Sequence, residues 1–245
     1  ILCEDTRRSL KLLNHYKITK KLISYHKFNE KKQTTSVIEH IKKGKILSLI
    51  SDAGTPLLSD PGKLLLKECY KNNIKVTPIP GVSSIVTAMS ASGFNDQFLF
   101  YGFLPKTENE INKVLVNLSN NNYSQVFFIT SNKINFYIKK FKEFFSGREI
   151  FIAKEMTKVH ETFFRGKIDD FEVFKNSMKG ELTVIISEKK KEAKSLNKKE
   201  IINKAKKYLK KYTLKDTVDL IFESEKINRK EIYKLCLYAK NKANT

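Results

Sequence analysis

A stretch rich in glycine, proline and small polar residues constrains this chain more than any other feature of its sequence. It reads Ser-Asp-Ala-Gly-Thr-Pro-Leu-Leu-Ser-Asp-Pro-Gly over residues 51–62 and follows the apolar run 46–50, which is typical of a buried parallel strand. Gly54 lets a ligand approach the backbone, and the prolines fix the path of the loop. Because ligands of open α/β sheets bind at the carboxyl ends of strands, the sequence predicts a binding loop here. The alternative is an ordinary strand-to-helix connection.

The composition places the chain among globular proteins. It has 245 residues, of which 40% are hydrophobic, and 17 are phenylalanine. Its apolar runs are too short to cross a bilayer and nothing resembles a signal peptide, so we expect a cytoplasmic protein. Cys3, Cys69 and Cys236 are widely separated and lack metal-ligand spacing, which predicts buried thiols rather than a disulfide or a metal site.

The positive charge of the chain is concentrated near its end. The formal net charge is +21, and residues 186–245 hold 18 Lys or Arg against 8 Asp or Glu, a net of +10. Such a charge predicts a polyanionic partner. Lys outnumbers Arg 42 to 5, so background codon bias explains part of the excess. A solvated basic surface without a partner is the alternative.

Strand and helix signals alternate along most of the chain, which predicts an α/β fold with a parallel sheet. The predicted helices are 6–15, 34–42, 62–72, 84–92, 111–118, 134–145 and 168–176, and the predicted strands are 22–25, 46–50, 74–78, 126–130, 149–153, 161–165 and 181–187. The apolar segment 98–105 predicts a connection between two lobes. Three short helices are expected after a lysine-rich linker, at 199–212, 214–223 and 229–240.

These signals divide the chain into an N-terminal lobe at 1–98, a C-terminal lobe at 99–190 and a basic helical segment at 191–245. The first residues, Ile-Leu-Cys, are typical of the end of a strand, so we expect a further segment before them. Four loops follow apolar strands and carry small or hydrogen-bonding residues: 52–56, 81–84, 130–132 and 154–157. Together they predict a cleft between the lobes for a small polar and aromatic ligand.

Several motifs occur in an order that resembles one known family. They are Glu-Asp-Thr-Arg-Arg at 4–8, Lys-Leu-Leu-Asn-His at 11–15, the stretch 51–62, Pro-Gly-Val-Ser-Ser at 80–84, Phe-Tyr-Gly-Phe-Leu-Pro at 100–105, Ala-Lys-Glu-Met-Thr-Lys at 153–158 and Lys-Gly-Glu at 179–181. The chain thereby resembles the ribosomal RNA small-subunit methyltransferase I group of the tetrapyrrole-methylase-like, class III S-adenosylmethionine-dependent enzymes. The resemblance implies two α/β lobes of the tetrapyrrole methylase type, with the active-site cleft between them and a small C-terminal helical appendage.

The sequence departs from this family in two places. The family's first strand, with its Thr-Pro-Ile-Gly-Asn-like loop, is not part of this chain, so we expect the chain alone to lack part of the cleft and its activity. The family's Tyr-Glu-Ser-Pro-His-Arg segment is Ile-Thr-Ser-Asn-Lys-Ile here, at 129–134. That loop therefore carries neither the acid nor the histidine of the family.

By resemblance, S-adenosylmethionine is the cofactor. The residues expected to line its pocket are Ala53, Gly54, Thr55, Leu58, Ser83, Ser84, Thr130, Met156 and Leu182. Ser83 and Ser84 open a helix whose free N–H groups could bind the cofactor, and simple helix capping is the alternative for both. Met156 could equally be an ordinary core residue.

Methylation of a ribose 2′-hydroxyl needs a group that removes the proton as the oxygen attacks, or a cation that stabilises the alkoxide. The candidate residues are Glu4 and Asp5 as bases, Arg7, Lys154 or Lys158 as cations, and Glu155 as a further carboxylate. Helix capping competes for Glu4 and Asp5, and a solvated surface competes for the lysines. The sequence does not choose the base.

The function implied by the resemblance is 2′-O-methylation of a cytidine in small-subunit (16S) ribosomal RNA, acting on the RNA or on the assembled small-subunit particle. Two alternatives stay open: a methylase of a tetrapyrrole or another small acceptor, and a non-catalytic RNA-binding relative. The basic C-terminal segment favours RNA, because a small acceptor would not need it. A role in forming a homodimer, or in stability alone, is the alternative for that segment.

Overall fold

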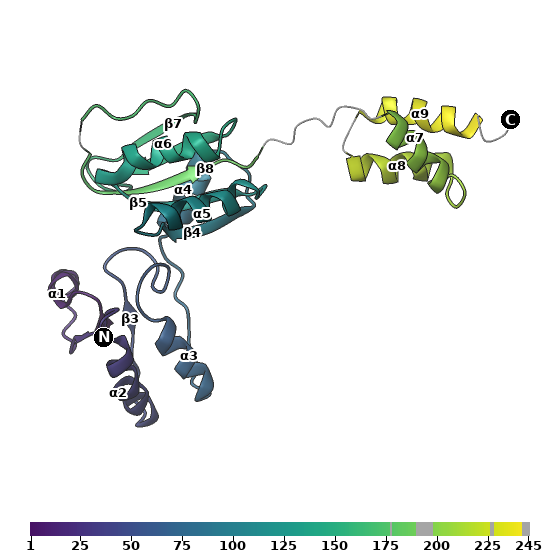
Figure 1. Cartoon of the computed structure of the whole chain (residues 1–245). Coiled ribbons are helices and arrows are strands. Elements are labelled where there is room, and N and C mark those ends of the chain that lie inside the picture. Colours follow the sequence, from purple (N-terminus) through teal and green to yellow (C-terminus); the bar gives the residue numbers. More distant parts are fainter. Residues whose placement is uncertain (177, 190–197, 226–227, 242–245) are drawn as a thin grey trace. The chain divides into compact units, whose positions relative to one another are not determined.

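The structure, a computed structural model, describes residues 1–176, 178–189, 198–225 and 228–241 (Figure 1). The chain divides into two compact units, residues 1–189 and 190–245. The first unit holds two sheets, and the second holds a small helical bundle. Among the described residues, no helix combines the length and apolar character needed to cross a membrane.

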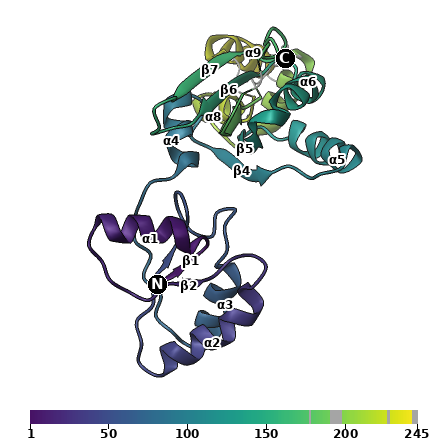
Figure 2. The same ribbon diagram turned by 90° about the vertical axis from the view of Figure 1, so that its left-hand side faces the viewer.

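The first sheet of the larger unit is short and parallel, as the alternating pattern predicted. Its strands have the order β2-β1-β3, with β1 at Leu2–Cys3, β2 at Ile23–Ser24 and β3 at Leu49–Ile50. Three helices belong to this region: α1 at Thr6–His15, α2 at Glu30–Lys42 and α3 at Lys63–Lys71. Helices α2 and α3 lie beside each other in both ribbon views (Figures 1 and 2). Their apolar faces pack with β1 around Leu2, Tyr25, Val37, Ile38, Leu65 and Cys69.

Two strand predictions in this region are wrong in detail. The run 46–50 is a strand only at its last two residues, and the Ile46 side chain is 98% exposed, because pairing with β1 covers only Leu49 and Ile50. Residues 74–78 are not a strand. Pro78 has no N–H to donate to a neighbouring strand, which works against sheet pairing there.

Helix α2 begins earlier than predicted, at Glu30, and this residue serves a different helix. One oxygen of its carboxylate accepts hydrogen bonds from the backbone N–H groups of Gly62 and Leu64, both at 3.0 Å. These are free donors in the first turn of α3, where a negative charge also suits the helix dipole. Glu30 therefore fixes the end of the 51–62 loop.

The second sheet has the strand order β4-β5-β8-β6-β7. Its strands are β4 at Phe98–Phe103, β5 at Ser124–Thr130, β6 at Glu149–Lys154, β7 at Thr162–Lys167 and β8 at Glu181–Ile186. The prediction of a parallel sheet is wrong here: β4 and β5 are parallel, but the other three pairs are antiparallel. Segment 98–105 supplies an edge strand of this sheet rather than a simple connection, and 168–176 is not helical.

Helices cover both faces of the second sheet. Helix α4 (Ser84–Ser92) places Ile85, Ala88 and Met89 on one face. Helices α5 (Glu108–Ser119) and α6 (Ile134–Phe144) cover the other face. Neighbouring strand residues point to opposite faces, so Phe151 packs beneath α4 while Ile152 packs beneath α5 and α6. Helix α4 is therefore part of the packing of this sheet, although it precedes residue 98; the division at 98 and 99 stays a prediction.

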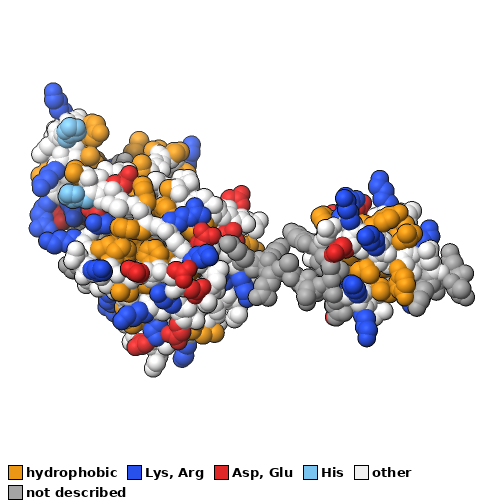
Figure 3. All heavy atoms as spheres, turned by 90° about the horizontal axis from the view of Figure 1, so that it is seen from above, with side chains coloured by type: hydrophobic (Ala, Val, Ile, Leu, Met, Phe, Trp, Pro, Cys, Tyr) orange, Lys and Arg blue, Asp and Glu red, His pale blue; other side chains and the backbone are white. Residues whose placement is uncertain are grey.

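The smaller unit contains α7 (Lys198–Tyr208), α8 (Leu214–Glu225) and α9 (Arg229–Asn241). Their apolar faces meet at Ile201, Ala205, Val218, Ile221, Ile232, Cys236 and Ala239. Ion pairs join Lys204 to Glu225 and Arg229 to Asp219. Lysine and arginine side chains alternate with hydrophobic ones over its visible face (Figure 3). We call the described part of this unit the helical unit.

All three cysteines are buried free thiols, as their spacing predicted.

Candidate active site

The loop predicted to bind a ligand has an unusual backbone. Gly54 and Gly62 have positive φ, and so do Leu57 (φ 72°) and Ser59 (φ 71°). A left-handed conformation is costly for a residue with a side chain, and such residues cluster at functional sites. The hydroxyl of Ser51 donates to the carbonyl of Gly54 at 3.1 Å, which closes the turn. The loop is thus held in one shape by its own contacts.

A hydrogen bond joins this loop to the start of α4. The Thr55 hydroxyl donates to the carbonyl of Val82 at 3.0 Å. Ser83 is the N-cap residue of α4, and its side chain makes no capping hydrogen bond. The first N–H groups of α4 are therefore available to an acceptor such as a carboxylate.

The two loops border a cavity of about 530 Å³, which we call the acidic cavity. This volume lies within the range typical of small-molecule sites. The lining residues are Glu4, Arg8, Asp52, Ala53, Gly54, Thr55, Leu58, Ser59, Asp60, Val82, Ser83, Ser84, Ile85, Thr87, Phe103, Phe128, Ile129, Ala153, Glu155, Met156, Thr157, Lys158, Glu181, Leu182 and Thr183. They come from the first sheet's loops, from α4 and from the ends of β5, β6 and β8.

The lining carries five carboxylates but only two cationic side chains, although the protein as a whole is strongly basic. Both cations are engaged. Arg8 lies 3.7 Å from Asp52, and Lys158 lies 2.9 Å from Glu155. The cavity is therefore suited to a cationic or hydroxyl-rich ligand.

Asp60 is the carboxylate whose environment is most altered. Burial raises its pKa to about 6, and the negative charges of Glu4, Asp52 and Glu181 raise it further, against a hydrogen bond from Ser51. Among the described residues Asp60 has no ion pair. A carboxyl that titrates near neutral pH can accept a proton from a substrate and release it to water.

Glu155 has the opposite environment. The hydrogen bond from Lys158 lowers its pKa, and the N–H of Glu181 also donates to it, at 3.4 Å. Gly180 leaves room for this carboxylate, because a Cβ at that position would overlap it. Glu155 and Thr157 both have positive φ, so the turn after β6 is as constrained as the 51–62 loop.

Comparison with known proteins agrees with this arrangement. The profile of the family described as Tetrapyrrole (Corrin/Porphyrin) Methylases matches residues 1–172. A curated Ribosomal RNA small subunit methyltransferase I from Thermotoga maritima is 41% identical over 194 residues, which cover 77% of this chain and 86% of the relative. The chain belongs to this family. The resemblance drawn from its motifs is confirmed.

Two further relatives bear the same printed name. The protein of Mesomycoplasma conjunctivae is 39% identical over 208 residues, covering 84% of this chain and 87% of its own. The protein of Buchnera aphidicola is 35% identical over 239 residues, covering 95% and 85%.

Solved structures confirm the fold class. The methyltransferase CobJ superposes with a TM-score of 0.54 at 15% identity, covering 71% of this chain and 79% of its own. Uroporphyrin-III C-methyltransferase of Thermus thermophilus, complexed with S-adenyl homocysteine, superposes with a TM-score of 0.50 at 12% identity, covering 76% and 84%. At these identities the likeness concerns the tetrapyrrole methylase fold alone.

Most residues that the family resemblance assigned to the cofactor lie together in the structure. Eight of them line the acidic cavity: Ala53, Gly54, Thr55, Leu58, Ser83, Ser84, Met156 and Leu182. Thr130 lies outside the lining, at the exposed end of β5, where it pairs with Glu181. Met156 also packs against the core beneath α4.

The residues proposed for catalysis are more dispersed. Glu4 and Glu155 line the acidic cavity. Asp5 is the N-cap residue of α1, accepts hydrogen bonds from the backbone and the side chain of Arg7, and has its pKa lowered to about 2 by them. The Arg7 side chain is 88% exposed. Lys154 lines a separate pocket, considered below.

Sequence reasoning missed Asp52, Asp60, Phe128 and Glu181 in the lining. Asp60 lies in the motif that drew attention first, in the dipeptide before Gly62, so its position was a usable signal. Glu181 adjoins the glycine of a recognised motif. Phe128 follows core residues of β5 and carries no signal of its own.

Proposed function

We propose that this protein transfers a methyl group from S-adenosylmethionine to the ribose 2′-hydroxyl of a cytidine in small-subunit ribosomal RNA. The observation that carries the proposal is the acidic cavity, where a glycine loop, a helix N-terminus and a carboxylate of raised pKa meet. The printed names of the relatives support RNA as the acceptor. The cytoplasm, where ribosomal RNA is available, is the proposed location.

The residues of the cavity fit S-adenosylmethionine. The free N–H groups at the start of α4 suit its carboxylate, and Gly54 permits close approach of the backbone. Carboxylates such as Glu4 and Asp52 suit its positive charges, while Met156 and Leu182 offer apolar surface to its adenine ring. When bound, the cofactor supplies an electrophilic methyl group on a sulfonium centre.

The chain's own task is to position the ribose hydroxyl and to take its proton. We assign the base to Asp60, because it lines the cavity and is unprotonated above about pH 6. Its proton acceptor is a carboxylate oxygen, which needs to lie within hydrogen-bond reach of the hydroxyl. Lys158 is the nearest candidate to stabilise the developing alkoxide, since its ammonium is held at the cavity wall by Glu155.

The other candidates take supporting roles in this proposal. Glu4 raises the pKa of Asp60 by its charge and is the second choice for the base. Asp5 and Arg7 hold the first turn of α1, which positions Glu4 and Arg8. The backbone N–H of Asp5 also donates to Asp52 at 3.2 Å, so α1 and the 51–62 loop are joined.

The helical unit is proposed to contact RNA. Lysines at 206, 207, 210 and 211 are exposed along and after α7, and exposed aromatic rings accompany them at Tyr212, Tyr233 and Tyr238. Ammonium groups neutralise phosphates and aromatic rings stack on bases, so this mixture is typical of RNA-binding surfaces. The lysine-rich linker predicted at 189–199 lies mostly outside the described residues.

The proposed function is tested by incubating the protein with labelled S-adenosylmethionine and unmethylated small-subunit particles. Mass spectrometry of the RNA should find one added methyl group on a cytidine ribose. Transfer to a tetrapyrrole but not to RNA would favour the small-acceptor alternative. RNA binding without cofactor binding would favour the non-catalytic one.

Removing residues 190–245 is expected to separate the two binding activities. Affinity for S-adenosylmethionine should stay within about threefold, while the KM for the particle should rise about 100-fold as phosphate contacts are lost. Calorimetry and a methylation assay measure the two quantities.

A matched variant controls for structural effects of that deletion. In the whole chain, exchanging Lys206, Lys207, Lys210 and Lys211 for glutamate keeps the helical unit but reverses its charge. It should reproduce the rise in KM. Equal losses of cofactor and particle binding, or a change from dimer to monomer in light scattering, would instead assign this unit to stability or to a homodimer.

A further inference from the structure

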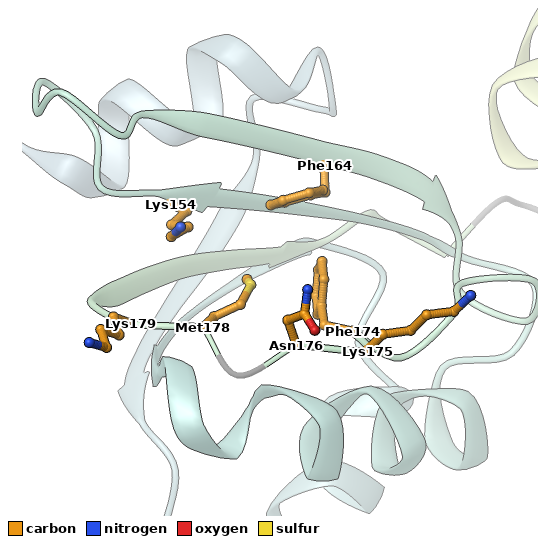
Figure 4. Close-up of a pocket in the computed structure, with 7 residues that line it drawn as sticks. All are labelled: Lys154, Phe164, Phe174, Lys175, Asn176, Met178 and Lys179. Atoms are coloured by element: carbon orange, nitrogen blue, oxygen red, sulfur yellow. The ribbon is translucent and has the colours of Figure 1, made fainter.

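A second pocket lies on the other face of the second sheet from the acidic cavity. It has a volume of about 500 Å³ and is lined by Lys154, Phe164, Phe174, Lys175, Asn176, Met178 and Lys179 (Figure 4). We call it the lysine–aromatic pocket. The figure shows Lys154 and Lys179 at one end, Lys175 reaching toward the other, and the two rings and Met178 between them.

Strand alternation explains why the two hollows are separate yet adjacent. On β6, Ala153 lines the acidic cavity, so its neighbour Lys154 points to the opposite face, which is the face of Ile152. Phe164 pairs in register with Ile152 from the edge strand β7. The next residue after Lys154 is Glu155, which lines the acidic cavity again. The constrained turn after β6 is therefore the wall between them.

The aromatic side of the pocket is built rather than incidental. Phe164 and Phe174 meet edge to face, with ring centroids 4.9 Å apart. Both rings pack against the core beneath α5 and α6 and stay partly exposed toward the pocket. The Asn135 side chain fixes the backbone of Phe174 at both its N–H (2.9 Å) and its carbonyl (2.8 Å). The rings are thus presented in a defined orientation.

The charge of this pocket is opposite to that of the acidic cavity. Three of the seven lining residues are lysines, and none of the seven is acidic. Lysine ammonium groups around a partly exposed aromatic surface offer what a single-stranded nucleotide needs, namely stacking for its base and neutralisation for its phosphates. A free sulfonium cofactor, by contrast, is repelled here.

We propose that the lysine–aromatic pocket binds a nucleotide of the RNA substrate that neighbours the one entering the acidic cavity, an inference that rests on the proposed function. The base stacks on Phe164 or Phe174, and the flanking phosphates meet Lys154, Lys175 and Lys179. The RNA backbone crosses the turn after β6, so the target ribose is delivered beside Lys158. The pocket thereby contributes to the choice of the methylated site.

Charge reversal of two exposed lysines tests this proposal in the whole chain. The variant Lys175→Glu/Lys179→Glu should raise the KM for the small-subunit particle about tenfold or more and leave the affinity for S-adenosylmethionine unchanged. The dependence of log binding constant on log salt should become shallower by about 1.4, because each lost phosphate contact on a single strand removes about 0.7. A second variant, Phe174→Leu, keeps an apolar side chain but loses the stacking surface, and should raise KM about fivefold or more.

The double variant Lys113→Glu/Lys139→Glu is the matched control. It changes the net charge equally, at exposed positions on α5 and α6 that do not line the pocket. KM values for the pocket variants that equal the control's would overturn the proposal. A raised KM with an unchanged salt dependence would also overturn it, since the contact would then be to ribosomal protein. If the wild-type chain itself transfers no methyl group to RNA, the proposed function fails instead.

Discussion

Asp60→Asn is expected to lower kcat for RNA methylation by about 100- to 10,000-fold, the usual range for a lost general base. The amide cannot accept the proton of the ribose hydroxyl, although it fills the same space. Affinity for S-adenosylmethionine should change little by comparison, because other groups of the acidic cavity remain. Single-turnover methylation and calorimetry separate the two effects.

The pH profile gives the same prediction a second readout. In wild-type protein, kcat/KM for the cofactor, which reports groups of the free enzyme, should rise with pH through about 6 and then level off, since Asp60 acts as the carboxylate. The groups that face Asp60 are the carboxylates of Glu4, Asp52 and Glu181 and the hydroxyl of Ser51. The Asp60→Asn profile should lack this inflection.

Stability provides the control against simple unfolding. The pKa of Asp60 is raised from 3.8 to about 6 on folding, so its charge opposes the native state at high pH. The contribution of this group to stability is full below about pH 4 and is lost as pH rises through about 6. Asp60→Asn should therefore increase the free energy of unfolding by about 1 to 2 kcal/mol at pH 8 and by almost nothing at pH 4.

One result would remove Asp60 from the mechanism. If Asp60→Asn keeps the wild-type kcat and pH profile while Glu4→Gln loses both, the base is Glu4.

Gly54→Val is expected to reduce the affinity for S-adenosylmethionine about 100-fold or more. The φ of +72° is strained for a β-branched residue, and the new side chain enters a loop that lines the acidic cavity. Its Cβ would lie 3.8 Å from the carbonyl oxygen of Val82, so the branched atoms extend toward the contact between the loop and α4. Calorimetry with the purified variant measures the loss.

The chain offers a matched control for the strain itself. Gly44 has a similar φ of +81°, and no atom lies within 4 Å of a Cβ placed there. Gly44→Val should cost comparable stability but leave cofactor affinity unchanged, because Gly44 lies outside the cavity lining. Equal cofactor affinity in folded Gly54→Val and Gly44→Val proteins would show that the 51–62 loop does not hold the cofactor.

Local chemistry predicted much of the fold. Helix α1 begins and ends where predicted, because Asp5 is a strong N-cap residue. Segment 98–105 was misassigned because a continuous apolar run marks burial without showing which sheet it joins. The antiparallel pairing of β6 and β7 was hidden as well, since their turn uses positive φ at Glu155 and Thr157 rather than at the glycine that usually signals it.

The site was predictable where one motif carried several of its residues. The 51–62 stretch contributes Gly54, Thr55 and Asp60 together. The catalytic candidates were harder, because their environment depends on residues distant in sequence. Burial and the charges of Glu4 and Glu181 set the pKa of Asp60, and only the folded chain brings these groups near one another.

The packing of α4 has a consequence for how ligand binding and folding are linked. This helix is fastened to the second sheet through Ile85, Ala88 and Met89, yet its first turn faces a loop that belongs to the first. In the empty protein, the hydrogen bond from Thr55 to Val82 is one tie between them. A molecule that touches both sides adds its binding energy to that tie, and so makes the two lobes unfold as one. Heat denaturation without ligand should then be broader than with it.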